Sequence, residues 1–107
     1  MPKFMIQAAY TPEGLKGVLK KGGSSRREAV QTMAAAQGGS LESFHFAFGE
    51  DDVYAIIDMP DNVSTAAVMM TVGASGALAS AKTVVLLTPE EVDQAGEKSV
   101  DYSPPGS

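Results

Sequence analysis

Hydrophobic and polar positions along the chain predict four strands and four short helices. Short apolar or alternating runs bounded by turn residues are typical of strands, and they occur at residues 3–10, 41–48, 53–58 and 82–87. Apolar residues that recur every three or four positions are typical of helices. They predict helices over residues 12–21, 25–37, 63–73 and 89–100.

Several helix starts carry capping signals. Thr11 followed by Pro12 fits an N-cap with proline at the first helical position. Ser25 with Glu28 three residues later predicts a capping box, and Thr88 precedes a similar Pro-Glu-Glu sequence. The helix over residues 63–73 is apolar on nearly every side, so we expect most of its surface to be covered.

The predicted order is β-α-β-β-α-β followed by a C-terminal helix. This order is typical of a ferredoxin-like α+β fold, in which helices cover one face of a four-stranded antiparallel sheet. We predict a single domain over residues 1–101 and a tail rich in Pro, Gly and Ser over residues 102–107.

The two faces of this sheet are both expected to be largely apolar. Alternation along the second strand predicts Phe44, Phe46 and Phe48 on one face against Leu41, Ser43, His45 and Ala47 on the other. The third strand divides in the same way, with Val53, Ala55 and Ile57 against Tyr54, Ile56 and Asp58. Because the helices cover only one face, the second face needs another partner. A second copy of the chain is the simplest partner, so we expect a homodimer or a higher oligomer.

Composition narrows the possible functions. The 107 residues carry a formal net charge of −5, which argues against binding through nucleic-acid phosphates. There is no cysteine and only one histidine, so disulfides and cysteine-based metal sites are excluded and no metal or cofactor is expected. No apolar run is long enough for a membrane helix, so we expect no membrane partner. The N-terminal residues lead directly into a strand pattern, which favours a cytoplasmic protein.

Three segments, residues 10–30, 38–62 and 82–93, together resemble the GYD domain family of small bacterial and archaeal proteins. The resemblance extends from Phe4 to about Tyr102. It implies a dimeric α+β barrel, in which two ferredoxin-like sheets pack face to face, and it implies no particular activity. The family signature is Gly-Tyr-Asp at the hairpin, whereas residues 49–52 here read Gly-Glu-Asp-Asp, with an acid in place of the aromatic residue.

His45 is the candidate catalytic residue, because it alone titrates near neutral pH without perturbation. It shares its predicted face with small residues that leave space beside it. As a functional group it would be a general base or an axial ligand, as in the related barrels of cofactor-free monooxygenases and haem-binding proteins. The alternative is a half-buried strand histidine bonded to a neighbour.

Further candidate ligand-binding residues lie at element ends. Arg26 and Arg27 follow a Gly-Gly-Ser-Ser loop at a predicted helix start, where backbone N–H groups and guanidinium groups can bind an anion. Solvated surface arginines are the alternative. Tyr10, Tyr54 and Asp58 lie at or near strand ends and could supply hydroxyl or carboxylate groups to a pocket. The acids of residues 50–52 are expected at a solvated hairpin tip.

These observations favour a homodimeric module that binds a small molecule or a protein. One alternative is a small enzyme of the monooxygenase or isomerase type with a pocket near His45. Another is a scaffold protein that docks through its proline-containing tail. The residues leave open whether the chain is an enzyme.

Overall fold

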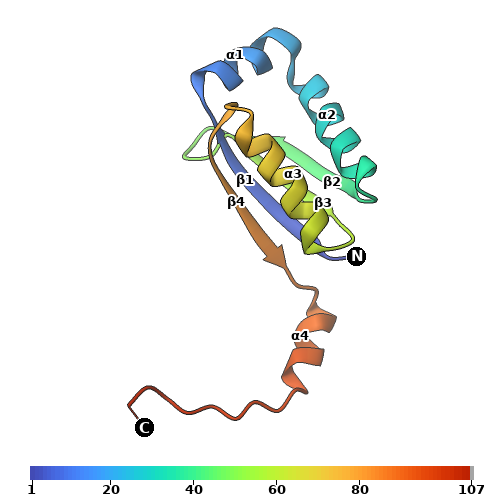
Figure 1. Ribbon diagram of the computed structural model, residues 1–107, viewed down its shortest axis with the longest axis vertical. Coiled ribbons are helices and arrows are strands. Elements are labelled where there is room, and N and C mark those ends of the chain that lie inside the picture. The colour runs from blue at the N-terminus through green and yellow to red at the C-terminus, as the bar shows by residue number, and fades with distance from the viewer. Residues whose placement is uncertain (107) are drawn as a thin grey trace.

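The computed structural model describes residues 1–106 of the chain. Ser107, the last residue of the predicted tail, lies outside the described residues. The elements follow in the order β1 (Lys3–Tyr10), α1 (Pro12–Lys21), α2 (Gly23–Ala36), β2 (Ser40–Phe46), β3 (Val53–Asp58), α3 (Asn62–Ala74), β4 (Leu78–Leu86) and α4 (Pro89–Gly96). Figure 1 shows α2 and α3 beside the sheet, while α4 extends away from it.

The four strands form one antiparallel sheet in the order β2-β3-β1-β4. This order and the helices alongside confirm the predicted ferredoxin-like α+β fold. β1 lies in the interior of the sheet and pairs with β3 on one side and β4 on the other. The first and last strands of the chain therefore become neighbours.

The core lies between the sheet and the helices. Side chains alternate between faces along a strand, and every second residue of the two central strands is buried: Phe4, Ile6 and Ala8 on β1, and Val53, Ala55 and Ile57 on β3. These residues face one another in register, with Ile6 opposite Ala55. Ala34 of α2 and partly buried residues of α3 pack against them. The predicted division of β3 into two sets of residues is thus confirmed, and the structure shows that Val53, Ala55 and Ile57 are the buried set.

The opposite side of the sheet carries no helix in the described chain. We call this surface the open face; pairing across the sheet defines its residues as Lys3, Met5, Gln7, Ala9, Ser40, Ser43, His45, Tyr54, Ile56, Asp58, Ser80, Lys82, Val84 and Leu86. Its middle row, with Met5 between Ile56 and Val84, is apolar, and its two ends are charged. The open face is therefore more polar than the sequence pattern predicted.

A bulge in β2 changes the predicted assignment of faces. Leu41 lies opposite Ile57, whereas Ser43 lies opposite Ile56, so Glu42 is an extra residue in this strand. An extra residue reverses the side on which all earlier side chains lie. Leu41 consequently packs on the core side with Phe44, and its predicted placement beside Ser43 and His45 was wrong.

The second strand is also shorter than predicted, because it ends at Phe46. Phe48 lies beyond the last paired residue and is fully exposed, so it does not share a sheet face with Phe44 and Phe46. The main-chain N–H of Ala47 donates to the Asp52 carbonyl, which closes the connection to β3. Residues 47–52 therefore form a loop between the two strands.

The junction of α1 and α2 uses one glycine for both helices. Gly22, with φ of 90°, ends α1 by donating to the Val18 carbonyl and is also the N-cap of α2. Because this turn needs only one residue, α2 starts at Gly23 and Ser25 already lies inside its first turn. The predicted capping box at Ser25 was therefore wrong, and α2 has no side-chain cap.

The other predicted helix starts are confirmed. The Thr11 hydroxyl accepts the Gly14 N–H, and the Asp61 carboxylate caps α3 by accepting the Ser64 N–H. Thr88 and Glu91 form a complete capping box at α4. The caps at Thr11 and Thr88 are local interactions, which explains why the sequence indicated them correctly.

The helix α3 is less covered than predicted, and α4 is shorter than predicted. Val63 and Met70 leave 79% and 73% of their surface exposed, so α3 is covered on one side only. The helix α4 ends at Gly96 instead of near residue 100 and buries none of its residues. A glycine weakens a helix that has no packing partner, which accounts for the early end.

The division into a domain over residues 1–101 and a tail stays a prediction. Within residues 1–106, no helix combines the length and the apolar character required to cross a bilayer.

Candidate functional site

A small apolar cavity lies between the sheet and the two helices that cover it. Its volume is about 60 Å³. The sheet contributes the small side chains Ala8 and Ala55, and α2 contributes Ala34. Alanines on both walls leave space that larger side chains would fill. Met33 and Met69 form the helical side of the cavity, and methionine adapts readily to the shape of a neighbour.

Two polar side chains lie at this cavity, Tyr10 from the end of β1 and Arg26 from the first turns of α2. Burial raises the pKa of the Tyr10 phenol, while the positive charge of the nearby Arg26 opposes that rise. The phenol therefore stays protonated at neutral pH and is available as a hydrogen-bond donor. The structure brings together these two predicted ligand-binding residues.

A surface groove of about 370 Å³ lies beyond Tyr10 and Arg26. Both residues line this groove as well as the cavity, so they lie where the two meet. The rest of the groove comes from α1 and the start of α2, including Glu13 and Lys21. A side chain at Gly14 would collide with the Ala77 carbonyl and the Tyr10 ring, so glycine there permits the close approach of α1.

Arg27 does not join Arg26. Successive residues of an α-helix point about 100° apart, and Arg27 lines a different recess of about 260 Å³ beside Phe44 and Phe46. The two candidate arginines therefore lie at different recesses and do not act together in one site. Their separation makes Arg27 a matched control for Arg26.

The remaining candidates lie on the open face, away from the cavity. His45 is exposed and lies opposite Tyr54 on the neighbouring strand, in a row that continues to Gln7. The row continues beyond Gln7 to Lys82. Glutamine does not titrate and the Lys82 ammonium is paired with Asp51, so no catalytic set accompanies His45 and Tyr54 in this row. The candidate residues thus form two groups on opposite sides of the sheet.

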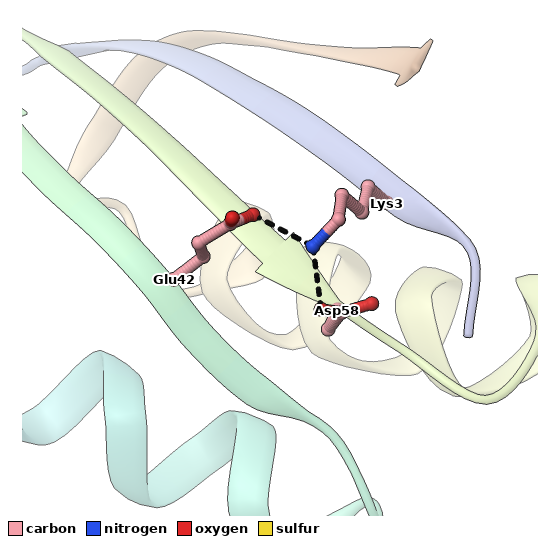
Figure 2. A network of polar contacts seen from close by, with 3 residues as sticks. All are labelled: Lys3, Glu42 and Asp58. Carbon is pink, nitrogen blue, oxygen red and sulfur yellow. Dashed lines mark hydrogen bonds and ion pairs between the residues drawn. The ribbon is translucent and has the colours of Figure 1, made fainter. Parts of the chain in front are cut away.

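Asp58 takes part in an ion-pair network at one end of the open face (Figure 2). The Lys3 ammonium donates to the Asp58 carboxylate at 2.8 Å and to the Glu42 carboxylate at 2.9 Å. Hydrogen bonding to Asp58, and then to Glu42, raises the pKa of Lys3 above its usual value. Asp58 therefore has a structural partner, and its predicted role in a pocket has no support from this geometry.

The acids of the hairpin loop are mostly structural, which corrects their expected place at a solvated tip. Asp51 is only 5% exposed and pairs with the Lys82 ammonium at 3.3 Å. The Asp52 carboxylate accepts the main-chain N–H of Tyr10 at 2.9 Å. Only Glu50 is exposed as predicted. Within the described part of the chain, no group of three or more His, Asp or Glu residues is arranged to hold a metal ion.

Sequence reasoning missed most of the cavity. Met33 and Met69 were not proposed as cavity residues, and Lys21 and Lys82 received no role. The periodicity that places Met33 on the covered side of α2 is visible in the sequence, but it cannot distinguish a filled core from a cavity. That distinction depends on side-chain volumes from β1, β3, α2 and α3 together.

Residues 4–95 match the family model described as the GYD domain. The chain belongs to the GYD domain family. Neither a curated protein nor a solved structure matches this chain significantly.

Membership of the GYD family confirms the resemblance that the sequence indicated, and it assigns no activity. In this GYD domain the hairpin acids Asp51 and Asp52 bind the Lys82 ammonium and the Tyr10 main chain respectively. The hairpin acids therefore hold β1, β4 and the β2–β3 loop together. The cavity and its two polar residues are the part of this domain best suited to binding.

Proposed function

We propose that this GYD domain is a cytoplasmic homodimeric binding module whose two copies recognise each other through the open face. The observation that carries the proposal is the arrangement of this face. An apolar row of Ile56, Met5 and Val84 crosses its middle, and charged residues occupy both ends. Specific protein interfaces commonly have such an apolar centre and polar rim.

The charges at the rim nearly cancel, which supports pairing of identical copies. Lys3 is held by Glu42 and Asp58 at one end, and Lys82 is held by Asp51 at the other. These five side chains carry two positive and three negative charges. Two such faces repel each other far less than the net charge of −5 for the whole chain would suggest.

The exposed C-terminal helix adds a second argument. Strands lie about 4.8 Å apart and rise about 3.3 Å per residue, so a four-stranded face of eight residues has a flat area of roughly 500 Å². A stable interface buries about 800 Å² on each partner. The helix α4 has no buried residue and exposes Val92, so it can supply the missing contact by packing on the partner copy.

Substitution of Ile56 by aspartate tests the proposal. Ile56 is already partly buried in the single chain, so its further burial contributes less than the value of about 1.5–3 kcal/mol for a fully exposed side chain, but aspartate would also place a charge in each copy's interface. Together these effects should cost a symmetric dimer at least about 3 kcal/mol, or roughly a hundredfold in affinity. Sedimentation velocity from micromolar to submillimolar concentration should show a dimer for the natural chain and a monomer for Ile56→Asp. Val85→Asp is the matched control, because Val85 is exposed on the other side of the sheet.

A natural chain that stays monomeric over this range would refute the proposal. So would an Ile56→Asp variant that remains dimeric, or a Val85→Asp variant that dissociates equally. Circular dichroism of both variants establishes that they are folded.

The enzyme alternative has less support. It depends on His45, which lies beside Tyr54 on the open face while the apolar cavity lies on the other side of the sheet. A general base must lie within hydrogen-bond reach of the proton it removes, and a pocket at His45 would first have to form between two copies. Binding is therefore the function that the geometry supports best.

A further inference from the structure

We propose that the cavity between the sheet and the helices binds the chain of a short unbranched aliphatic carboxylate, with its carboxylate held by Arg26 and Tyr10. This site lies on the opposite side of the sheet from the proposed dimer surface. It therefore goes beyond the proposed function and is testable whether or not the chain forms dimers.

The size of the cavity sets the size of the apolar group. A group the size of a water molecule needs about 10–15 Å³ of cavity volume. A cavity of about 60 Å³ therefore accepts a chain of roughly four to six carbon atoms. A benzene-sized ring occupies a cavity of about 150 Å³, which excludes aromatic groups of that size without rearrangement. An unbranched chain of about five carbons fits best.

The wall of the cavity favours an apolar chain over water. Aliphatic side chains and methionines form it almost entirely, with Ala8 and Ala55 behind and Met33 and Met69 in front. A water molecule in such a space lacks the two to four polar partners that it needs. An alkyl chain instead gains the free energy of leaving water.

The cavity entrance favours a negative head group. Among residues 1–106, no carboxylate lies within 4.0 Å of the Arg26 guanidinium, so its charge is not neutralised by an ion pair. A guanidinium can donate two parallel hydrogen bonds to a carboxylate. The Tyr10 phenol is protonated at neutral pH, as an ordinary tyrosine is, so its hydroxyl can donate a further one.

The groove beside α1 provides the approach to this entrance. It is lined by Tyr10 and Arg26 together with Lys21, and its other charged residue is Glu13. The lysine and the arginine give the groove a net positive charge, although the chain as a whole is acidic. A small anion is therefore drawn to this part of the surface.

The six methionines of the chain provide an internal control for where a ligand binds. Met33, Met59 and Met69 line the cavity. Met5 lies on the open face, and Met1 and Met70 are exposed. With the methionine methyl groups labelled with ¹³C, titration of the full chain with hexanoate should shift the three cavity signals saturably and leave the other three unchanged.

Chain length and head group test the chemistry. Affinity should rise about fourfold per methylene from propanoate to hexanoate, because each buried methylene contributes equally, and should level off by decanoate when the cavity is full. Hexan-1-ol and hexylamine have the same chain without the negative charge. Each should bind at least tenfold more weakly than hexanoate.

Variants at two neighbouring arginines complete the experiment. Arg26→Met should lose at least tenfold in hexanoate affinity while hexan-1-ol binding is unchanged, and Arg26→Lys should lose less. Arg27→Met removes the same charge from the next residue and should bind hexanoate like the natural chain. Arg26 is partly exposed on a helix, so these variants are expected to fold, which their melting curves check.

Three results would overturn the proposal. The first is the absence of saturable shifts at millimolar hexanoate, and the second is shifts confined to Met5 or Met70. The third is an equal loss of affinity in Arg26→Met and Arg27→Met, since that would indicate a general effect of surface charge.

Discussion

Replacement of Asp52 by alanine should destabilise the domain through the main chain of Tyr10. The Asp52 carboxylate accepts the Tyr10 N–H at 2.9 Å across the end of β1. The main-chain groups of Asp52 make two further hydrogen bonds, to Ala8 and from Ala47, each at 2.8 Å. The substitution removes only the side-chain contact, so it leaves one partly buried N–H without its acceptor.

The size of the effect follows from that single contact. A hydrogen bond to a charged group contributes about 1.5–3 kcal/mol, and partial access of water to this site favours the lower end. A loss of about 1.5 kcal/mol lowers the melting temperature of a domain of this size by roughly 6–12 °C. Asp52→Asn keeps an oxygen acceptor without the charge and should lose about half as much free energy.

Urea unfolding at a fixed protein concentration measures this loss, and hydrogen exchange of the Tyr10 amide locates it. The matched control is Glu50→Ala, which removes an exposed acid from the same loop and should change stability by less than about 0.5 kcal/mol. Equal unfolding free energies for Asp52→Ala and Glu50→Ala would refute the structural role of Asp52. Unchanged exchange at Tyr10 would refute the mechanism even if stability fell.

Two further predictions concern a close approach and a helix cap. Gly39→Ala should cost about 1–3 kcal/mol in urea unfolding, because its methyl group would collide with the Asp58 carbonyl. Gly17→Ala, inside α1 and in open space, should instead stabilise by about 0.5–1 kcal/mol, and a Gly39 variant as stable as the Gly17 variant would contradict the packing argument. The Ser64 N–H lowers the pKa of Asp61, so the stability from this cap is complete above the ordinary aspartate pKa of about 3.9 and is lost as the pH falls through the lower folded value. Asp61→Asn cannot titrate and should show a shallower loss of stability below about pH 4 in acid unfolding, whereas an unchanged slope would show that other carboxylates dominate.

Local chemistry allowed the elements to be predicted from the sequence. The strand Val53–Asp58 and the caps at Thr11 and Thr88 were predicted correctly, because alternation and capping act between residues a few positions apart. The start of α2 was predicted wrongly for the converse reason. The start of α2 is set by Gly22, which ends α1 and caps α2. The capping-box motif at Ser25 contains no information about that turn, so it predicted a start that is too late.

The candidate site was predicted only in part. Tyr10 and Arg26 were both proposed as ligand-binding residues, but nothing in the sequence placed them at one cavity or separated Arg26 from Arg27. The acids Asp51 and Asp52 looked like a solvated tip because their partners, Lys82 and Tyr10, lie 31 and 42 residues away.

The sequence by itself determined the order of strands and helices, the absence of disulfides and the membership of the GYD family. Only the tertiary structure decided which side chains share a face, because the single extra residue Glu42 reverses that assignment in β2. It also decided where space remains in the core, since alanines on β1, β3 and α2 leave a cavity only when the three elements meet. Periodicity acts over one turn or one pleat, whereas register and cavity volume depend on residues distant in the chain.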